Sequence, residues 1–236
     1  TLIDFREPGL LGIFTDEASI RRLEKTMKRT GFLPKEDMQR SFNLLRTNDL
    51  IWNYAVSSWL MGEEPAAFDL LSWNNDSTRM PAEMHTFYLR SCYVENQLAR
   101  GVMELAGERL DLAKVDQDLY FLSAEQDHIA PWKSSYAGAR LPAGNVRFVL
   151  SNSGHIAGIV NPPSPKSIHR VLEGKKQLPA DPAVWMAAAT IHPVTWWEDW
   201  AEWIASRAGG MRKPPRMGNR KYRPIADAPG TYVLEA

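Results

Sequence analysis

The chain has 236 residues, enough for one large domain or two small ones, and its 28 Lys and Arg residues balance 28 Asp and Glu residues. This balance excludes a strong overall field that would attract nucleic acid or an acidic membrane surface. Hydrophobic residues make up 44% and charged residues 24%, which is typical of a globular protein. The single cysteine, Cys92, excludes an internal disulfide and fits a reducing compartment.

The beginning of the chain predicts neither a signal peptide nor a membrane anchor. Thr1–Phe5 has no starting Met and no basic region followed by an apolar one. No apolar run elsewhere approaches the roughly 20 residues of a transmembrane helix. Thr1–Phe5 is instead typical of the end of a strand, so we expect residues 1–10 to close a core strand whose fold begins upstream.

Between about residues 11 and 100, predicted helices alternate with loops and no convincing strand is present. Asp16 can accept hydrogen bonds from the first turn of a helix, and Gly31 can end that helix. The predicted segments are helices over Asp16–Arg29, from Asn48 or Asp49 to Gly62, and over Glu83–Arg100, with a loop over Glu63–Pro81.

From Leu110 onward the pattern changes to strand, turn and helix. Leu119–Leu122 and Val146–Leu150 are short apolar runs bounded by turn residues, which is typical of buried parallel strands. Trp132–Arg140 lies between them and predicts a crossover helix. The remaining predicted segments are a loop from Pro162 to about Pro182 and helices over Ala183–Thr190 and Trp196–Arg207.

The end of the chain combines an aromatic helix face with a basic tail. One face of the last predicted helix carries Trp196, Trp197, Trp200, Trp203 and Ile204. We interpret this face as core packing rather than as a platform for substrate. Met211–Arg223 holds six Lys or Arg residues in thirteen positions, together with two prolines. We therefore expect residues 209–236 to form an extended, solvated tail, which could also meet phosphate groups.

Two polar turns carry residues that suit a catalytic triad. Asp127 follows the first predicted parallel strand and His155 follows the second. In α/β-hydrolases the acid and the histidine occupy such turns, in the chain order nucleophile, acid, histidine. We predict that Asp127 orients His155 and that His155 removes a proton from a nucleophile. His128, next to the acid, is expected to have a supporting or structural role.

The chain contains no recognisable nucleophile for this pair. A nucleophile elbow needs a small residue on each side, as in Gly-x-Ser-x-Gly, and the only glycines at that spacing are Gly154 and Gly158, with Ile156 between them. Cys92 lies in a helical context without flanking glycines, so we expect it to be a buried hydrophobic residue and not a nucleophile. His85, His169 and His192 lack partners at ligand spacing, and we therefore expect no metal site.

Several blocks of sequence, in the same order, resemble the C-terminal part of the catalytic domain of class I poly(3-hydroxyalkanoate) synthases, the poly(3-hydroxybutyrate) polymerases. The blocks are Thr1–Phe5, Arg46–Tyr54, Phe68–Asp76, Phe87–Arg90, Asp127–Trp132, Ser153–Pro163, Trp196–Trp200 and Gly218–Arg223.

The resemblance implies an α/β fold, the C-terminal part of an α/β-hydrolase core with an inserted, mostly helical cap subdomain. It implies a cap over residues 11–100 and a core over residues 101–208. It also implies a Cys-Asp-His triad in which Asp127 and His155 match the acid and the histidine. The family's cysteine lies upstream of the strand that ends near Phe5, and Cys92 does not match it. We therefore expect this chain alone to be inactive.

The same resemblance implies the reaction and its setting. The family polymerises (R)-3-hydroxyacyl-CoA, here expected to be 3-hydroxybutyryl-CoA, into a polyester and releases CoA without a cofactor. The implied partners are the substrate, the growing chain, a second subunit bound through the cap, and granule-associated proteins, with no nucleic acid. The implied location is cytoplasmic, at the surface of polyester granules. The division of base roles between Asp127 and His155 stays open.

Two other interpretations are compatible with the same residues. The chain could be part of a generic α/β-hydrolase that acts on small esters, which a serine nucleophile upstream would favour. It could instead be a non-catalytic module for dimerisation or granule binding.

Overall fold

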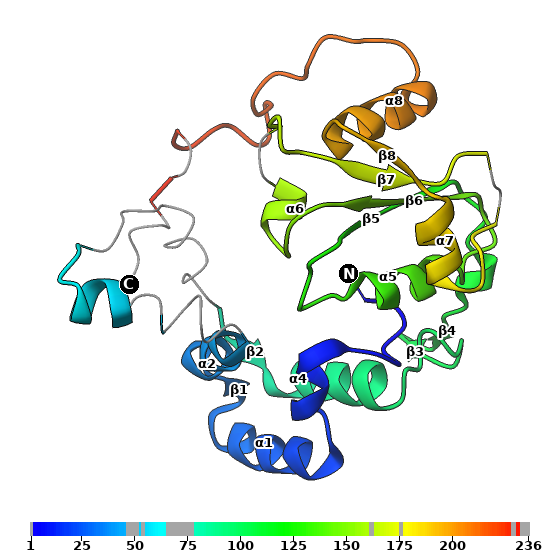
Figure 1. Cartoon of the computed structure of the whole chain (residues 1–236). Coiled ribbons are helices and arrows are strands. Elements are labelled where there is room, and N and C mark those ends of the chain that lie inside the picture. The colour runs from blue at the N-terminus through cyan, green and yellow to red at the C-terminus, as the bar shows by residue number, and fades with distance from the viewer. Residues whose placement is uncertain are drawn as a thin grey trace. The chain divides into compact units, whose positions relative to one another are not determined.

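The computed structural model in Figure 1 divides the chain into two compact units, Thr1–Asp199 and Trp200–Ala236, which are described separately below. Within these units the structure describes residues 2–45, 52, 55–64, 78–160, 163–174, 177–227 and 230–231. The first part of the predicted helix that ends at Gly62 (residues 48–51, 53 and 54) and most of the predicted loop over Glu63–Pro81 lie outside the described residues, and so do the block Phe68–Asp76 and all of the block Arg46–Tyr54 except Trp52. The later part of that predicted helix is helical over Ala55–Leu60.

The first unit contains a four-stranded sheet in the order β5-β6-β7-β8. Strands β5 (Leu119–Ala124) and β6 (Val146–Ser151) are parallel, which confirms the two predicted buried strands. Strands β7 (His169–Val171) and β8 (Thr190–His192) continue the sheet in antiparallel pairing. These two strands were not predicted, because three residues are too few to show a strand's alternation.

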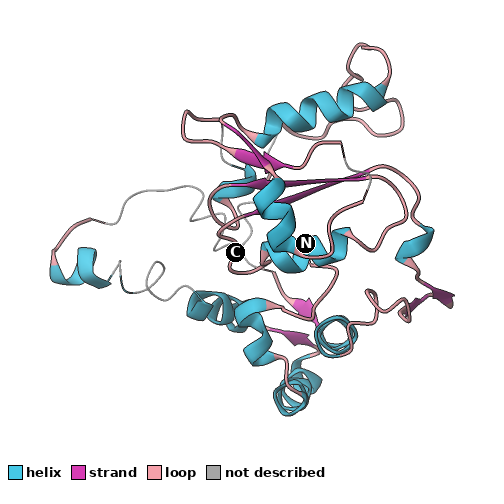
Figure 2. Cartoon of the chain, turned by 45° about the vertical axis from the view of Figure 1, so that its right-hand side comes forward, coloured by secondary structure: helices cyan, strands magenta, loops and turns pink. Residues whose placement is uncertain are grey.

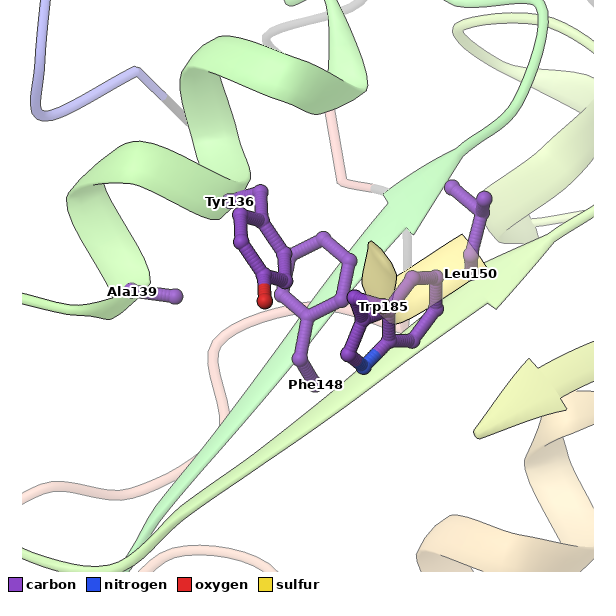
Figure 3. Close-up of a cluster of buried hydrophobic side chains, with 5 residues drawn as sticks. All are labelled: Tyr136, Ala139, Phe148, Leu150 and Trp185. Carbon is purple, nitrogen blue, oxygen red and sulfur yellow. The ribbon is translucent and has the colours of Figure 1, made fainter. Parts of the chain in front are cut away.

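Two helices cover one face of this sheet around an aromatic core. Helix α5 (Trp132–Ala139) is the predicted crossover between β5 and β6, and α7 (Pro182–Ala188) lies beside it (Figure 1 and Figure 2). Figure 3 shows how Tyr136, Phe148 and Trp185 converge from α5, β6 and α7. The Phe148 ring centroid lies 5.0 Å from that of Tyr136 and 5.1 Å from that of Trp185, both edge to face. Such contacts add specific geometry to the hydrophobic burial that stabilises the sheet.

The opposite face of the sheet carries a charged network. Tyr120 and Arg147 are register partners on β5 and β6, so their side chains share this face. Arg147 Nε donates to Asp199 Oδ2 at 2.9 Å, and the Tyr120 hydroxyl donates to the same oxygen at 2.8 Å. Arg147 also forms two hydrogen bonds to Glu173, at 2.8 and 2.9 Å. These bonds hold the first turn of helix α8 (Trp196–Ala208) against the sheet.

The helices that precede the sheet begin and end largely as their sequences indicate. Helix α1 (Glu17–Thr30) begins where Asp16 Oδ1 accepts from Ala18 N at 2.9 Å and from Ser19 N at 3.0 Å. It ends at Gly31, which has a left-handed φ of 77°. Helix α2 (Lys35–Leu45) was not predicted, nor was the short pairing of β1 (Phe32–Leu33) with β2 (Met80–Pro81).

The predicted helix over Glu83–Arg100 is shorter in the structure. Helix α4 (Ala82–Tyr88) continues into the π-helical segment η4 (Leu89–Val94) and stops there. Asn96 follows with a left-handed φ of 48°, and its side chain bonds Asp4 and the backbone N of Phe5 in the N-terminal segment. Arg90 on η4 bonds both Glu17 and Glu24, so η4 is tied to α1.

The N-terminal strand predicted for Thr1–Phe5 is not formed in the described residues 2–5. Phe5 N donates to Asn96 Oδ1 at 3.0 Å, and Arg6 N donates to Asp4 Oδ1 at 3.1 Å. Side chains therefore take the hydrogen bonds that pairing with a neighbouring strand would need. The wider partition into a cap over residues 11–100 and a core over residues 101–208 stays a prediction.

The remaining elements of the first unit are short. They are η1 (Gly9–Phe14), η3 (Ala55–Leu60), β3 (Glu104–Leu105), β4 (Glu108–Arg109), η5 (Leu112–Lys114) and α6 (Ala157–Val160).

The second unit begins within α8 and continues as a tail. The helix predicted over Trp196–Arg207 is confirmed. Trp196 and Trp203 are partly buried while Trp197 and Trp200 are exposed, and the interpretation of these tryptophans as core packing stays a prediction. Residues 209–227 form neither helix nor strand, in agreement with the predicted extended tail. Among the described residues, no helix combines the length and the apolar character needed to cross a bilayer.

Candidate active site

The acid lies in a tight turn directly after β5. Asp127 N donates to Ala124 O at 3.1 Å, which closes the turn. Asp127 Oδ1 accepts from Ile129 N at 2.9 Å and from Ala130 N at 2.8 Å. An aspartate that bonds the backbone just downstream is a common turn former. The turn therefore fixes the carboxylate, whose side chain is only 7% exposed.

The histidine lies between β6 and α6, and a close packing contact fixes the position of that short helix. A Cβ added at Gly158 would lie 2.5 Å from Ala124 Cβ and 2.8 Å from Asn152 O, so only glycine allows α6 to approach the end of β5 this closely. Ser151 Oγ also donates to Gly158 O at 2.7 Å. These contacts bring His155 to the turn that carries Asp127.

Asp127 and His155 form a hydrogen-bonded pair. His155 Nδ1 lies 2.9 Å from Asp127 Oδ2 and 3.0 Å from Oδ1. An ionised carboxylate can only accept, so Nδ1 must carry the proton and Nε2 must be the proton acceptor of the neutral ring. The His155 side chain is 41% exposed, and no described residue is hydrogen-bonded to Nε2. The geometry is that of a histidine ready to act as a general base.

Opposing effects set the ionisation of Asp127. Burial by itself would raise the pKa of Asp127, but the hydrogen bonds from His155 and from the backbone N–H groups of Ala130 and Ile129 lower it, and the net shift is downward. The carboxylate is therefore ionised at neutral pH and can stabilise the imidazolium that forms when His155 takes a proton.

Cys92 has the surroundings of a structural thiol. It is buried in η4 and packs in a cluster with Phe5 and Met103. Burial raises the pKa of Cys92, whereas a nucleophilic cysteine needs a lowered one.

The other histidines lie in varied surroundings. His128 follows Asp127 in the same turn and is partly buried, and its supporting role stays a prediction. Burial lowers the pKa of His85. His169 and His192 stack with ring centroids 4.9 Å apart on the sheet face that carries Arg147. Within the described ranges, no group of three or more His, Cys, Asp or Glu residues could hold a metal ion.

A cavity of about 440 Å³ lies away from the Asp127–His155 pair, beside α5. It is lined by Asp4, Arg6, Glu7, Lys133, Ser134, Tyr136, Ala137, Arg140, Ala180 and Pro182. Neither Asp127 nor His155 contributes to it, so this cavity does not belong to the candidate site.

The sequence prediction missed one residue beside the histidine. Asn152 bonds the segment that leads into β7, and Ser153 after it has a left-handed φ of 74°. The available signal was the Asn-Ser-Gly run after β6, since such residues favour turns.

Comparison with known proteins identifies the family of the chain. The family described as alpha/beta hydrolase fold matches residues 14–162, and the chain belongs to that family. The predicted fold class is thereby confirmed.

Curated relatives give a narrower similarity. The chain is 46% identical over 236 residues to the poly(3-hydroxyalkanoate) polymerase of Methylorubrum extorquens, covering 99% of this chain and 38% of that protein. It is 45% identical over 233 residues to the poly(3-hydroxyalkanoate) polymerase subunit PhaC of Rhizobium meliloti (strain 1021), covering 99% of this chain and 38% of that protein. Against the corresponding subunit of Cupriavidus necator the identity is 41% over 241 residues, covering 99% and 40%.

The resemblance to poly(3-hydroxyalkanoate) polymerases is therefore confirmed over nearly the whole chain. The chain spans about two fifths of the length of these curated relatives.

Proposed function

We propose that the chain is the part of a poly(3-hydroxyalkanoate) polymerase that supplies the acid and the histidine of its catalytic triad. The observation that carries this proposal is the 2.9 Å contact between His155 Nδ1 and Asp127 Oδ2, with Nε2 left available. The names of the relatives give the substrate class, since they polymerise 3-hydroxyalkanoates.

The proposed first step is acyl transfer from a CoA thioester to a cysteine supplied by sequence outside this chain. His155 Nε2 takes the thiol proton, the thiolate sulfur bonds the acyl carbon, and the bond from that carbon to the sulfur of CoA breaks. The proton on His155 then passes to the departing CoA thiolate. Because a free cysteine has a pKa near 8.5 and is mostly protonated at neutral pH, this transfer requires the base.

The proposed second step extends the polyester. The base removes the proton from the hydroxyl of a 3-hydroxyacyl unit, and the oxygen bonds the acyl carbon of the acyl-enzyme. The bond to the cysteine sulfur breaks, and the base returns the proton to the cysteine thiolate. Hydrogen bonds from His155, Ile129 and Ala130 already occupy the Asp127 carboxylate, which favours His155 as the base in both steps. In this assignment Asp127 orients His155 and stabilises its charge.

The finer parts of the proposal follow the resemblance. The substrate is (R)-3-hydroxybutyryl-CoA, no cofactor takes part, and the enzyme works in the cytoplasm at the surface of polyester granules. It forms a homodimer through the cap and meets granule-associated proteins there. The chain alone is inactive because its cysteine, Cys92, is a buried thiol with a raised pKa and cannot serve as the nucleophile.

The test is CoA release from (R)-3-hydroxybutyryl-CoA by two proteins. One is this chain alone, and the other is a chimera in which the chain replaces the matched region of the Methylorubrum extorquens polymerase. We expect no release by the chain and clear release by the chimera. Release by the chain alone would overturn the assignment of the nucleophile to another segment. A chimera that folds but releases no CoA, under conditions in which the parent polymerase does release it, would overturn the proposed function. Turnover of a simple ester without polymer would favour the generic hydrolase.

A further inference from the structure

The side chain of Asn152 ties the histidine loop, residues 152–155, to the segment that enters β7. Asn152 Nδ2 donates to Lys166 O at 3.0 Å, and Asn152 Oδ1 accepts from Ile168 N at 3.2 Å. The backbone N of Asn152 also donates to Ile168 O at 3.2 Å. The amide thus uses both its donor and its acceptor on one short stretch of backbone, which fixes its orientation.

The residues on either side of Asn152 bond the turn after β5 instead of the segment that enters β7. Ser151 O accepts from Glu125 N, and Ser153 O accepts from Gln126 N, both at 2.9 Å. The turn that carries Asp127, residues 124–127, is called the acid turn. It bonds the carbonyls before and after Asn152, while Asn152 itself bonds the segment that enters β7. The chain between these two sets of bonds is forced out of the regular strand path.

Ser153 takes up this distortion. Its φ of 74° lies in the left-handed region, which a serine rarely adopts. Such a conformation persists only where surrounding interactions enforce it. Gly154 and His155 follow at once, so the Ser153 backbone angle sets the direction from which the imidazole approaches Asp127.

The segment that Asn152 bonds, residues 166–168, leads into β7, and β7 is bonded to the acid turn. Arg170 on β7 donates from Nη1 to Glu125 Oε2 at 2.6 Å. Glu125 is also the residue whose backbone N bonds Ser151 O. Hydrogen bonds thus link the acid turn, the histidine loop and the entry to β7 in a closed ring.

We propose that Asn152 is a positioning residue for His155, acting by holding Ser153 in the left-handed conformation that brings the imidazole onto Asp127. The inference rests on the proposed function, in which His155 is the base, and it names a further residue of that same site. Asn152 itself touches neither substrate nor nucleophile in this account.

The test is the tautomer of neutral His155 in the full 236-residue chain, read at alkaline pH by long-range proton–nitrogen NMR of labelled histidine, with His155→Ala used to assign the signal. In the unmodified chain we expect the Nδ1–H form, because Asp127 accepts from it. Asn152→Ala should lower the ratio of Nδ1–H to Nε2–H by about three- to tenfold, the factor for one ordinary hydrogen bond. Asn145→Ala is the matched control at the other end of β6, where Asn145 Nδ2 donates to Asp118 Oδ1 at 2.8 Å, and it should leave the ratio unchanged.

A rescue separates positioning from general loosening of the fold. Glycine adopts a positive φ without steric cost, so adding Ser153→Gly to Asn152→Ala should restore roughly half of the lost ratio on a logarithmic scale. If Asn152→Ala does not fold, Asn152→Asp keeps the acceptor for Ile168 N and loses the donor to Lys166, and it should give a smaller drop.

The outcomes are distinct. A drop confined to the Asn152 variants with recovery on Ser153→Gly supports the inference. An unchanged ratio in Asn152→Ala, an equal drop in Asn145→Ala, or no recovery overturns it and leaves the proposed function standing. An unmodified chain that shows no preference for Nδ1–H overturns both.

Discussion

Asp127 and Asp199 are buried carboxylates in the same unit, and their partners differ. Asp199 is held by the Arg147 guanidinium and the Tyr120 hydroxyl, and Arg147 is only 23% exposed. Asp127 is held by the backbone of its own turn and by a histidine that is 41% exposed. Burial raises the pKa of each acid and hydrogen bonds lower it, with a net downward shift in both. The difference teaches that the partner, rather than the carboxylate, separates a site that can react from a contact that only holds the fold.

The largest expected effect is on catalysis at the exposed partner. Asp127→Asn in the active chimera should lower the rate of CoA release by about 10³- to 10⁴-fold, because an amide can hold His155 in the wrong tautomer. The free energy of unfolding should change far less. The measurement is CoA release at saturating substrate, with Asp199→Asn as the matched change. Equal losses of rate per folded molecule in the two variants would contradict the comparison.

The second effect is on the stability that the Asp199–Arg147 pair contributes. Asp199→Asn should lower the free energy of unfolding by about 2–3 kcal/mol, since Arg147 stays largely buried with only Glu173 to compensate its charge. Urea unfolding of the 236-residue chain measures this. Asp37→Asn is the control, because its pair with Arg40 is exposed and should contribute little. A loss no greater than that of the control would show that the network does not hold the fold.

The third effect concerns the packing that brings His155 to the acid. Gly158→Ala should lower the free energy of unfolding by about 1–3 kcal/mol, because the added methyl overlaps Ala124 Cβ and a backbone oxygen. In the chimera it should also lower CoA release. Gly210→Ala is the control, since a Cβ there meets nothing within 4 Å. Equal stability of both variants would contradict the close approach of α6 to β5.

The smallest effect is the acid dependence of stability. An acid whose folded pKa is lowered contributes stability above its ordinary value, near 3.8, and this contribution is lost as the pH falls through the lower folded pKa. The free energy of unfolding should therefore fall with decreasing pH below about 4. Replacing either Asp127 or Asp199 by asparagine should flatten that fall. Unfolding curves at several acidic pH values test this, and an unchanged slope in both variants would contradict the lowered pKa values.

Local patterns predicted the pair Asp127 and His155 because each follows an apolar strand, and parallel strands bring their ends to one edge. The same reasoning could not reach Asp199, whose partner Arg147 lies 52 residues away along the chain. It failed at Thr1–Phe5, where the Asn96 side chain takes a backbone bond that a strand would use. It also missed β7 and β8, whose three residues each are too short for any periodicity. The ion pair of Asp199 and the bond from Phe5 N to Asn96 escaped prediction because contacts between residues far apart in the chain determine them.

The turn that holds Asp127 has a consequence for how the site meets its nucleophile. Two backbone N–H groups of its own loop orient the Asp127 carboxylate independently of His155. The dipoles around the base are therefore preorganised, and little reorganisation energy is required when positive charge develops on the imidazole. Nε2 of His155 is therefore already oriented when a thiol reaches it. The entropy that the reaction still has to overcome would come mainly from positioning that thiol.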